Sequence, residues 1–303
     1  MATEPQSSES DESPHAGAPD AYDDLLDRYR QVTYLQDAGM VLSWDQQVMM
    51  PEEGTPARSK QQSALSSVGH EKLTADAVGD ALDELDGADL TEEQAAVVRE
   101  VRREYEREAA VPKELVERIS EETSSALPVW EQAREESEWE QFAPQVETLL
   151  DLKREYAEHI DPDADPYAVL FADYEPCLDL EVADRVLTRL REELVPIIDA
   201  IAESDATLAA DAFDGEFDPD VQEAVARDAL SELGYPWERG RLDRSTHPFS
   251  TGNQFDARVT TRFKPEDPVD ALTSTIHEFG HATYTLGLRE DEYGPPLGRH
   301  RGR

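Results

Sequence analysis

Two histidines with a glutamate between them, in the segment His277-Glu278-Phe279-Gly280-His281, are the residues best suited to do chemistry. Histidines four positions apart share one face of a helix, so both imidazoles can reach one Zn²⁺ ion at about 2.0 to 2.1 Å. Glu278 follows the first histidine and is placed to take a proton from a metal-bound water. The ion would supply hydroxide near neutral pH and polarise a carbonyl, and the carboxylate would pass the proton to the leaving amine. The pattern predicts peptide hydrolysis.

The main alternative is a pair of surface histidines on a solvated helix. With 7 histidines in the chain, random placement predicts only roughly 0.02 occurrences of this motif. Ile276, Phe279 and Ala282 also make the helix largely apolar around the motif. Gly280 costs a helix about 1 kcal/mol relative to alanine, so we expect another part of the protein to pack closely there.

The motif lies in a segment with clear helix signals. Asp267 is a suitable N-cap, Pro268 suits the first helical position, and Gly287 can close the helix. Directly before it, residues 245–263 contain a Val-Thr-Thr run and a Gly252-Asn253 turn. We therefore predict a hairpin of two short strands, followed by the helix that carries the motif.

Most of the remaining chain has apolar residues three or four positions apart, which predicts helices. The first helix begins at Ala21 and ends near Trp44, where residues 43–51 are expected to pack in the core. Thr91, Pro112 and Asp218 are start signals for later helices. The further helices are predicted at 57–68, 71–85, 91–109, 112–126, 128–136, 139–160, 180–203 and 218–233, with a short helix and turn within 167–179. The fold class is therefore mainly α, a helical bundle with a small β-hairpin or sheet before the motif helix.

The chain is strongly acidic, with 69 Asp and Glu against 28 Lys and Arg and a formal charge of −41. This charge argues against binding to a nucleic-acid backbone or an anionic membrane, and no apolar run approaches the roughly 18 to 20 residues of a spanning helix. Cys177 is the single cysteine, so an internal disulfide framework is excluded. The N-terminus has no basic start followed by an apolar stretch. We expect a cytoplasmic protein.

The acidic excess, together with the scarcity of lysine, is typical of proteins adapted to high salt. A disordered acidic chain or a nucleic-acid mimic is the alternative, and the helical periodicity argues against it beyond residue 20. Residues 1–20 combine Ser, Pro, Gly and acid with almost no large apolar side chain. They are expected to form a disordered acidic tail.

Beyond the His277–His281 segment, two further motifs make the sequence resemble the M32 metallocarboxypeptidases, also called the carboxypeptidase Taq family. The H-P-F motif stands as His247-Pro248-Phe249 and the D-x-R-x-T motif as Asp256-Ala257-Arg258-Val259-Thr260. The order and spacing of the three motifs are more specific than H-E-x-x-H alone. The similarity also includes the segments 42–51, 130–142 and 173–176, and it covers about residues 21–298.

The resemblance implies a helical, zincin-like (gluzincin) fold with a cleft, and a zinc- or cobalt-dependent carboxypeptidase that releases C-terminal amino acids from peptides, usually as a homodimer. On the matching positions, His277 and His281 would be metal ligands and Glu278 the general base. His247 and Arg258 would bind substrate in or beside the cleft, although Arg258 could instead pair with a carboxylate such as Asp256. Cys177 stands where the family commonly has glycine and is expected to be a buried thiol.

One part of the family pattern is missing. The family takes its third ligand from a glutamate in an H-E-S-Q motif roughly 25 to 30 residues beyond the second histidine, whereas 22 residues follow His281 here. The later I-R-x-x-A-D and G-x-x-Q-D-x-H-W motifs are also absent. We expect residues 21–298 to be an incomplete catalytic domain, truncated before the third ligand, and residues 299–303 to be a non-family tail. The remaining candidates for a third ligand are Glu290, Asp291, Glu292 and His300.

Two functions stay open at this point. The first is a zinc carboxypeptidase whose activity is impaired in this chain. The second is a non-catalytic remnant or acidic helical binding module that keeps the scaffold. The presence or absence of a third metal ligand would distinguish the two functions.

The first prediction concerns salt. Helical circular dichroism should rise strongly between about 0.1 M and about 2 M KCl, because added ions screen the repulsion among the carboxylates over a length that falls to about 3 Å at 1 M. A chain equally folded and equally heat-resistant at both concentrations would contradict the interpretation as a high-salt protein.

Overall fold

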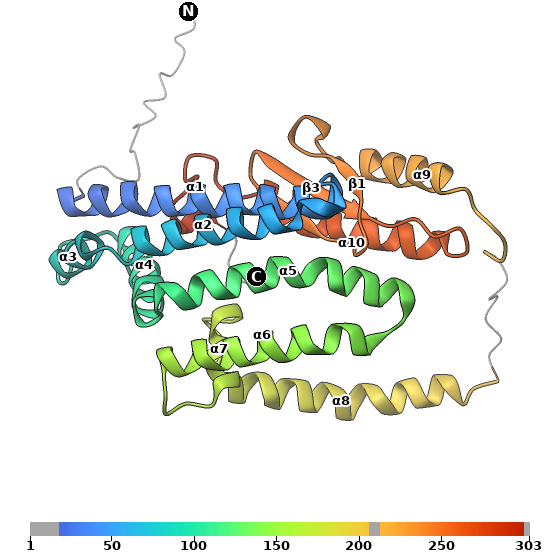
Figure 1. Ribbon diagram of the computed structural model, residues 1–303, viewed down its shortest axis with the longest axis horizontal. Helices are drawn as coiled ribbons and strands as arrows, with labels where there is room; N and C mark the ends of the chain where they lie inside the picture. The colour runs from blue at the N-terminus through green and yellow to red at the C-terminus, as the bar shows by residue number, and fades with distance from the viewer. Residues whose placement is uncertain (1–17, 206–212, 300–303) are drawn as a thin grey trace, which may run out of the picture.

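Helices carry most of the chain in the computed structural model, as predicted (Figure 1). The model describes residues 18–205 and 213–299, so residues 1–17 of the tail expected over residues 1–20, and the candidate ligand His300, lie outside the described residues. Asp20, the last residue of that expected tail, begins α1. The helices are α1 (Asp20–Val48), α2 (Thr55–Leu73), α3 (Asp76–Glu84), α4 (Glu92–Ala110), α5 (Lys113–Glu136), α6 (Trp139–Ile160), α7 (Pro166–Tyr174), α8 (Leu180–Ala202), α9 (Pro219–Glu232) and α10 (Pro268–Leu286), with 3-10 turns at Glu52–Gly54, Trp237–Arg239 and Pro296–Gly298.

Three of the expected helix starts are confirmed by side-chain caps, and α5 begins directly after Pro112 without one. Thr91 forms a capping box with Gln94, in which the Thr91 hydroxyl accepts from the Gln94 N–H at 3.2 Å. Asp218 caps α9, and Asp267 caps α10 by accepting from the Asp270 N–H at 2.9 Å. These carboxylates and hydroxyls satisfy backbone donors that have no partner inside the helix.

Three predicted helix boundaries are wrong. The expected break between residues 68 and 71 falls inside α2, which runs on to Leu73. Residues 112–126 and 128–136 form one helix, α5, which continues through Pro128. The first helix also continues past Trp44 to Val48. A proline removes one helical hydrogen bond, but α5 packs lengthwise between α2 and α6, and this packing outweighs the local break.

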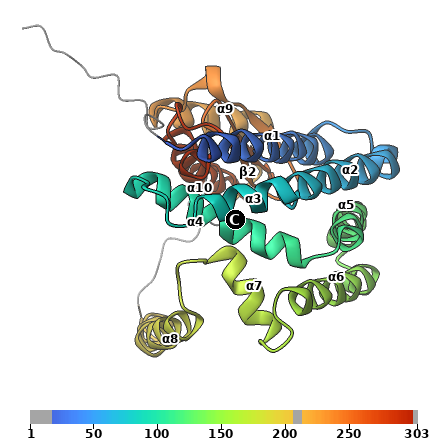
Figure 2. The ribbon, with the colours of Figure 1, turned by 90° about the vertical axis from the view of Figure 1, so that its left-hand side faces the viewer.

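The helices α1, α2, α5 and α6 pack side by side in that order, and α10 with the sheet lies at one end of α1 and α2 (Figure 1). In the turned view of Figure 2, α8 lies apart from α6 and from α10. No helix among the described residues is both long enough and apolar enough to cross a lipid bilayer.

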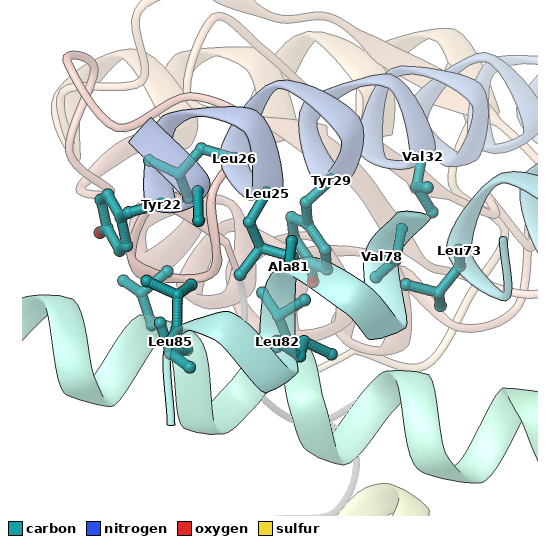
Figure 3. Close-up of a cluster of buried hydrophobic side chains, with 14 residues drawn as sticks. Tyr22, Leu25, Leu26, Tyr29, Val32, Leu73, Val78, Ala81, Leu82 and Leu85 are labelled. Carbon is teal, nitrogen blue, oxygen red and sulfur yellow. The ribbon is translucent and has the colours of Figure 1, made fainter. Parts of the chain in front are cut away.

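The largest buried cluster joins α1, α3 and α4. Leu25 and Leu26 of α1 are fully buried against Leu82 of α3, and Val97 and Val101 of α4 close the cluster. Figure 3 shows the α1 side chains directed toward α3. Since burying one such side chain contributes about 1.5 to 3 kcal/mol, this cluster fixes the N-terminal end of α1.

The sheet has three strands, β1 (Leu242–Arg244), β2 (Ser250–Asn253) and β3 (Asp256–Thr261), in the order β1-β3-β2. The antiparallel pair β2–β3 is the predicted hairpin. Gly252 has φ of +132°, and a Cβ there would lie 1.8 Å from the Asp256 carbonyl oxygen, so the turn requires glycine. The parallel strand β1, with Leu242 opposite Val259, was not predicted because three residues carry no alternation.

The second prediction concerns His70, a buried residue of α2 whose ring nitrogens have no hydrogen-bond partner within the described part of the chain. Burial lowers the pKa of His70; the nearby Glu71 carboxylate raises this pKa by a smaller amount, and the Lys113 ammonium lowers it further. The folded protein therefore binds this proton less readily than the unfolded chain, and stability is lost as the pH falls below about 6.5.

His70→Leu should remove that component of the acid sensitivity while leaving the other titrations in place. The measurement is urea unfolding in high salt from pH 8 to pH 5. If the free energy of unfolding falls equally with pH in the two proteins, His70 does not contribute to the acid sensitivity.

Candidate metal centre

The helix α10 presents the two motif histidines together. The Nε2 atoms of His277 and His281 are 3.2 Å apart. Zinc–nitrogen bonds of about 2.0 to 2.1 Å to both atoms would meet at about 100°, near the tetrahedral angle. The two rings therefore fit one ion, and they are exposed to receive it.

The opposite side of α10 is buried against the sheet. Ala282 packs in one cluster with Ala257 and Val259 of β3, and Phe279 lies against the same cluster. We call these contacts between α10 and β3 the seam. It sets the rotation of α10 about its axis, so His277 and His281 face outward.

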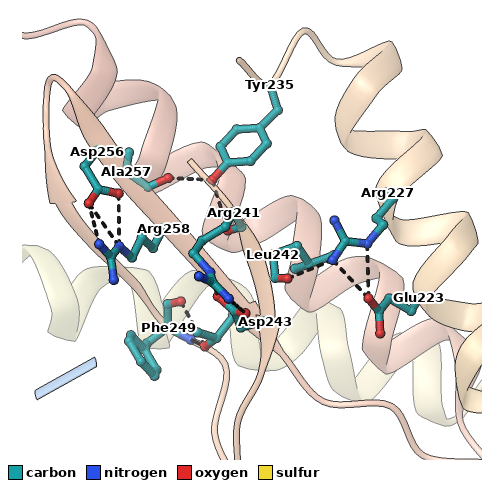
Figure 4. Close-up of polar contacts among 11 residues, drawn as sticks. Glu223, Arg227, Tyr235, Arg241, Leu242, Asp243, Phe249, Asp256, Ala257 and Arg258 are labelled. Carbon is teal, nitrogen blue, oxygen red and sulfur yellow. Dashed lines mark hydrogen bonds and ion pairs between the residues drawn. The ribbon is translucent and has the colours of Figure 1, made fainter. Parts of the chain in front are cut away.

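Tyr235 ties this seam to the sheet. Its ring meets Phe279 edge-to-face at 5.9 Å, and its hydroxyl donates to the Ala257 carbonyl oxygen (Figure 4). Burial raises the pKa of Tyr235 to about 12, so the phenol stays protonated and remains a donor at neutral pH.

Glu278 lies one position after His277 and turns toward the buried side, with 9% of its surface exposed. Within the described part of the chain, no hydrogen bond or ion pair holds its carboxylate. A carboxylate free of such partners beside two imidazoles is available to accept a proton. Glu278 thus has the position that the motif predicts for a base.

Arg258 makes the pairing that the sequence left open. Its guanidinium donates to both carboxylate oxygens of Asp256, with the Nη2 to Oδ2 distance at 2.6 Å (Figure 4). The same group lies over the Trp44 ring at 4.2 Å, and Arg241 lies over that ring at 4.8 Å. Trp44 is buried, as expected, whereas Met49 of the same predicted core segment is 60% exposed, so the segment packs in the core only in part.

Arg258 and the histidines lie on different sides of the sheet. Successive residues of a strand point to opposite faces, and Ala257 and Val259 pack toward α10. Arg258 faces α1 and lines a cavity of about 210 Å³ whose other lining residues include Asp37, Asn253 and Tyr293. No described lining residue of that cavity comes from α10.

His247 lies in the exposed loop between β1 and β2. Its ring meets Trp130 of α5 edge-to-face, with centroids 6.5 Å apart. Neighbouring residues tie the loop to the same helix, because the Arg134 guanidinium donates to the Thr246 carbonyl oxygen at 3.0 Å. The structure brings His247 to α5, and among the described residues its ring has no contact with the histidine pair.

Thr260 is a positioning residue that the sequence analysis missed. Its hydroxyl accepts from the Phe249 N–H at 2.9 Å and lies 2.7 Å from the Ser245 hydroxyl. The threonine of the D-x-R-x-T motif thus holds the H-P-F loop against β3. The sequence did point to this residue, because Thr260 is the threonine of the D-x-R-x-T motif.

The described candidates for a third ligand are paired with arginines or buried. Glu290 pairs with Arg239, Asp291 pairs with Arg289, and Glu292 is buried with 2% of its surface exposed. Among residues 18–205 and 213–299, no group of three or more His, Cys, Asp and Glu side chains is arranged to hold a metal ion. The described part supplies two imidazoles and a base.

Two expectations about small residues are wrong. A Cβ on Gly280 would meet no heavy atom within 4 Å, because this glycine is on the exposed side of α10. Cys177 is exposed, because it lies in the turn after α7 rather than in the core.

The family model for carboxypeptidase Taq (M32) metallopeptidases matches residues 24–302. The chain belongs to the M32 metallopeptidase family. Thermostable carboxypeptidase 1 of Thermus thermophilus is 32% identical over 292 residues, which are 92% of this chain and 57% of the relative.

Solved structures agree with this membership. The Pyrococcus furiosus carboxypeptidase matches with a TM-score of 0.82 at 30% identity, over 94% of this chain and 58% of that one. The M32 carboxypeptidase of Deinococcus radiodurans R1 matches with a TM-score of 0.78 at 31% identity, over 92% of this chain and 56% of that one. The mainly helical fold with a small sheet is confirmed, and this M32 chain spans little more than half the length of these relatives.

The third prediction concerns metal binding. The 303-residue M32 chain should bind zinc weakly, because two imidazoles make an incomplete site, and His281→Ala should abolish that binding. His159→Ala, at the exposed end of α6, is the matched control. Isothermal titration checks this, and stoichiometric zinc that survives dialysis against a mild chelator would contradict it.

Proposed function

We propose that this chain carries the metal-binding and general-base part of a zinc carboxypeptidase site that releases C-terminal amino acids from peptides. The observation that supports it most is the pair of outward-facing imidazoles 3.2 Å apart, with the Glu278 carboxylate at the next position. Family membership supports a divalent metal and a carboxypeptidase reaction. Zinc is the proposed ion, with cobalt as a working substitute.

His277 and His281 would hold the ion through their Nε2 atoms, and the seam against β3 would keep both rings directed at it. The bound ion supplies a Lewis acid that activates water and polarises the scissile carbonyl. Glu278 would accept the water proton on its carboxylate and deliver it to the leaving amine nitrogen.

A third protein ligand would come from polypeptide outside the described residues. The resemblance implies a glutamate for this position, which would complete a His₂Glu site. Without it, and without a group that holds the free carboxylate of the substrate, we propose that the 303-residue chain is impaired as an enzyme. Positioning alone can account for about 7 to 11 kcal/mol of barrier reduction.

His247 and Arg258 remain proposed substrate-binding residues. Support for His247 is its exposure beside Trp130, where a peptide could reach it. Arg258 is held by Asp256 and Trp44, so we propose that its contribution is made as this paired group, from the cavity side of the sheet. We further propose a cytoplasmic, high-salt host and a homodimer, for which the charge of −41 and the family resemblance are the support.

The fourth prediction tests the general base. The 303-residue chain should hydrolyse blocked dipeptides near background in high salt with added zinc or cobalt. Joining it to the portion of an M32 relative that it lacks should restore release of C-terminal amino acids. Glu278→Gln in the joined form should reduce kcat by about 10²-fold or more, because proton transfer is lost.

His159→Ala in the joined form is the control and should leave activity unchanged. Activity of the joined form that survives Glu278→Gln would contradict the role of the base. Activity of the 303-residue chain itself, lost with Glu278→Gln, would contradict the incomplete site.

A further inference from the structure

The cavity beside Arg258 is separate from the histidine pair. It lies between α1 and the β2–β3 hairpin and has a volume of about 210 Å³. One water molecule needs only about 10 to 15 Å³ of such space, so the cavity has room for a small organic molecule. Val41 lines the cavity and is 45% exposed, so a ligand can enter from solvent.

Asp37 of α1 supplies a carboxylate to this cavity, and two neutral groups hold it in place. The Tyr293 hydroxyl donates to its Oδ2 atom at 2.6 Å, and the Asn253 amide donates to the same atom at 3.1 Å. Burial raises the pKa of Tyr293, and the bond to Asp37 raises it further, so the phenol remains a donor at neutral pH. The carboxylate is thus fixed by groups that carry no charge.

The other oxygen of Asp37 is available to a ligand. Because both donors bind Oδ2, Oδ1 receives no hydrogen bond from any residue that the structure describes. Within 18–205 and 213–299, no basic side chain forms an ion pair with Asp37 either. Arg299 acts on it only from a longer distance, since that guanidinium binds the Tyr29 hydroxyl and the Gln36 amide oxygen.

Arg258, the basic residue in the described wall of the cavity, does not offset this charge. Its Nε and Nη2 atoms donate to the Asp256 carboxylate, which also lines the cavity (Figure 4). Two carboxylates against one guanidinium leave the described wall with one negative charge. A ligand that carries one positive charge therefore fits the cavity best.

An organic cation suits these groups better than a metal ion does. Calcium takes about six to eight oxygen ligands, whereas no cluster of three or more His, Cys, Asp and Glu in the described chain is arranged to hold a metal. An ammonium group brings its own donors, and its hydrogen bond to a carboxylate is roughly twice as strong as a neutral one. Met40 and Val41 supply apolar surface for the alkyl part of such a ligand.

We propose that the cavity binds a small organic molecule through its primary ammonium group, which donates to Oδ1 of Asp37. The alkyl part of the ligand lies against Met40 and Val41. Simple alkylamines and free amino acids both carry this group, and an amino acid adds a carboxylate that can bind Nη1 of Arg258, which Asp256 leaves unused. The inference goes beyond the proposed function and involves no residue of α10. Binding is measured without metal, so either idea can fail alone.

Three probes that differ only in their charged groups test this site. L-Norleucine carries an ammonium group and a carboxylate on one carbon, n-pentylamine is the same molecule without the carboxylate, and hexanoate is the same molecule without the amine. Binding to the metal-free 303-residue chain in high salt is measured by titration. Both amines should bind, and hexanoate should not. Tighter binding of norleucine than of pentylamine would identify an amino acid as the ligand, and the reverse order would identify a simple amine.

A methionine in the cavity wall reports where the amine binds. The chain has four methionines, so labelling their methyl groups with ¹³C gives few NMR signals. Met40 lines the cavity, whereas Met49 is 60% exposed and does not line it. Pentylamine should shift the Met40 signal, which Met40→Leu identifies, and leave the Met49 signal in place.

The test variant is Asp37→Asn, which removes the charge but keeps an oxygen that can accept from Tyr293 and Asn253. It should retain its circular dichroism and bind both amines about tenfold or more weakly, because the charged acceptor becomes neutral. The matched control is Asp24→Asn, which makes the same change at an exposed position of the same helix. It should bind like the unmodified chain.

Four results would overturn the proposal. The first is equal binding of pentylamine by Asp37→Asn and the unmodified chain. The second is hexanoate binding as tight as that of pentylamine. The third is the absence of binding by both amines. The fourth is amine binding that leaves the Met40 signal unmoved, because the ammonium group would then bind outside the cavity.

Discussion

The apolar seam between α10 and β3 is the contact on which the candidate metal centre depends. Ala257 and Val259 of the strand and Ala282 of the helix are all at most 1% exposed. Small residues let helix and strand approach closely, and Tyr235 fixes the strand from a third side. With one side of α10 buried, the motif histidines have only one direction in which to point. The placement of the two imidazoles is therefore a consequence of how the helix is packed.

The other face of the sheet is held by charge and aromatic contacts rather than by apolar packing. Arg258 and Arg241 lie over Trp44, and each is paired with a carboxylate of the sheet, Asp256 or Asp243. In a chain with so few basic residues, two arginines are placed on one tryptophan. Guanidinium groups stack on aromatic rings and bind carboxylates at the same time. These contacts connect α1 to the sheet across a large separation in sequence.

Sequence reasoning located what depends on short-range chemistry. The spacing of His277 and His281 and the caps at Thr91 and Asp267 are local patterns, and the structure has them as predicted. What failed depends on contacts distant in sequence. Pro128 stays helical because α2 and α6 flank it, and β1 exists because β3 offers it an edge.

The same reasoning explains the residues that were misplaced. Gly280 was expected in a close contact because glycine is costly in a helix. That cost does not say which side of the helix the glycine occupies, and Gly280 is on a side of α10 that is open among the described residues. Thr260 was passed over because a threonine in a strand is ordinary; its bonds to the H-P-F loop are visible only in three dimensions.

X-ray absorption at the zinc edge tests most directly the claim that α10 directs both imidazoles to one ion. At protein concentrations high enough for the unmodified chain to bind zinc, the bound ion should show two imidazole nitrogens at about 2.0 to 2.1 Å, and this two-imidazole signal should be absent in His277→Ala and in His281→Ala. A spectrum with a single imidazole in the unmodified chain, or with two in either variant, would contradict the account.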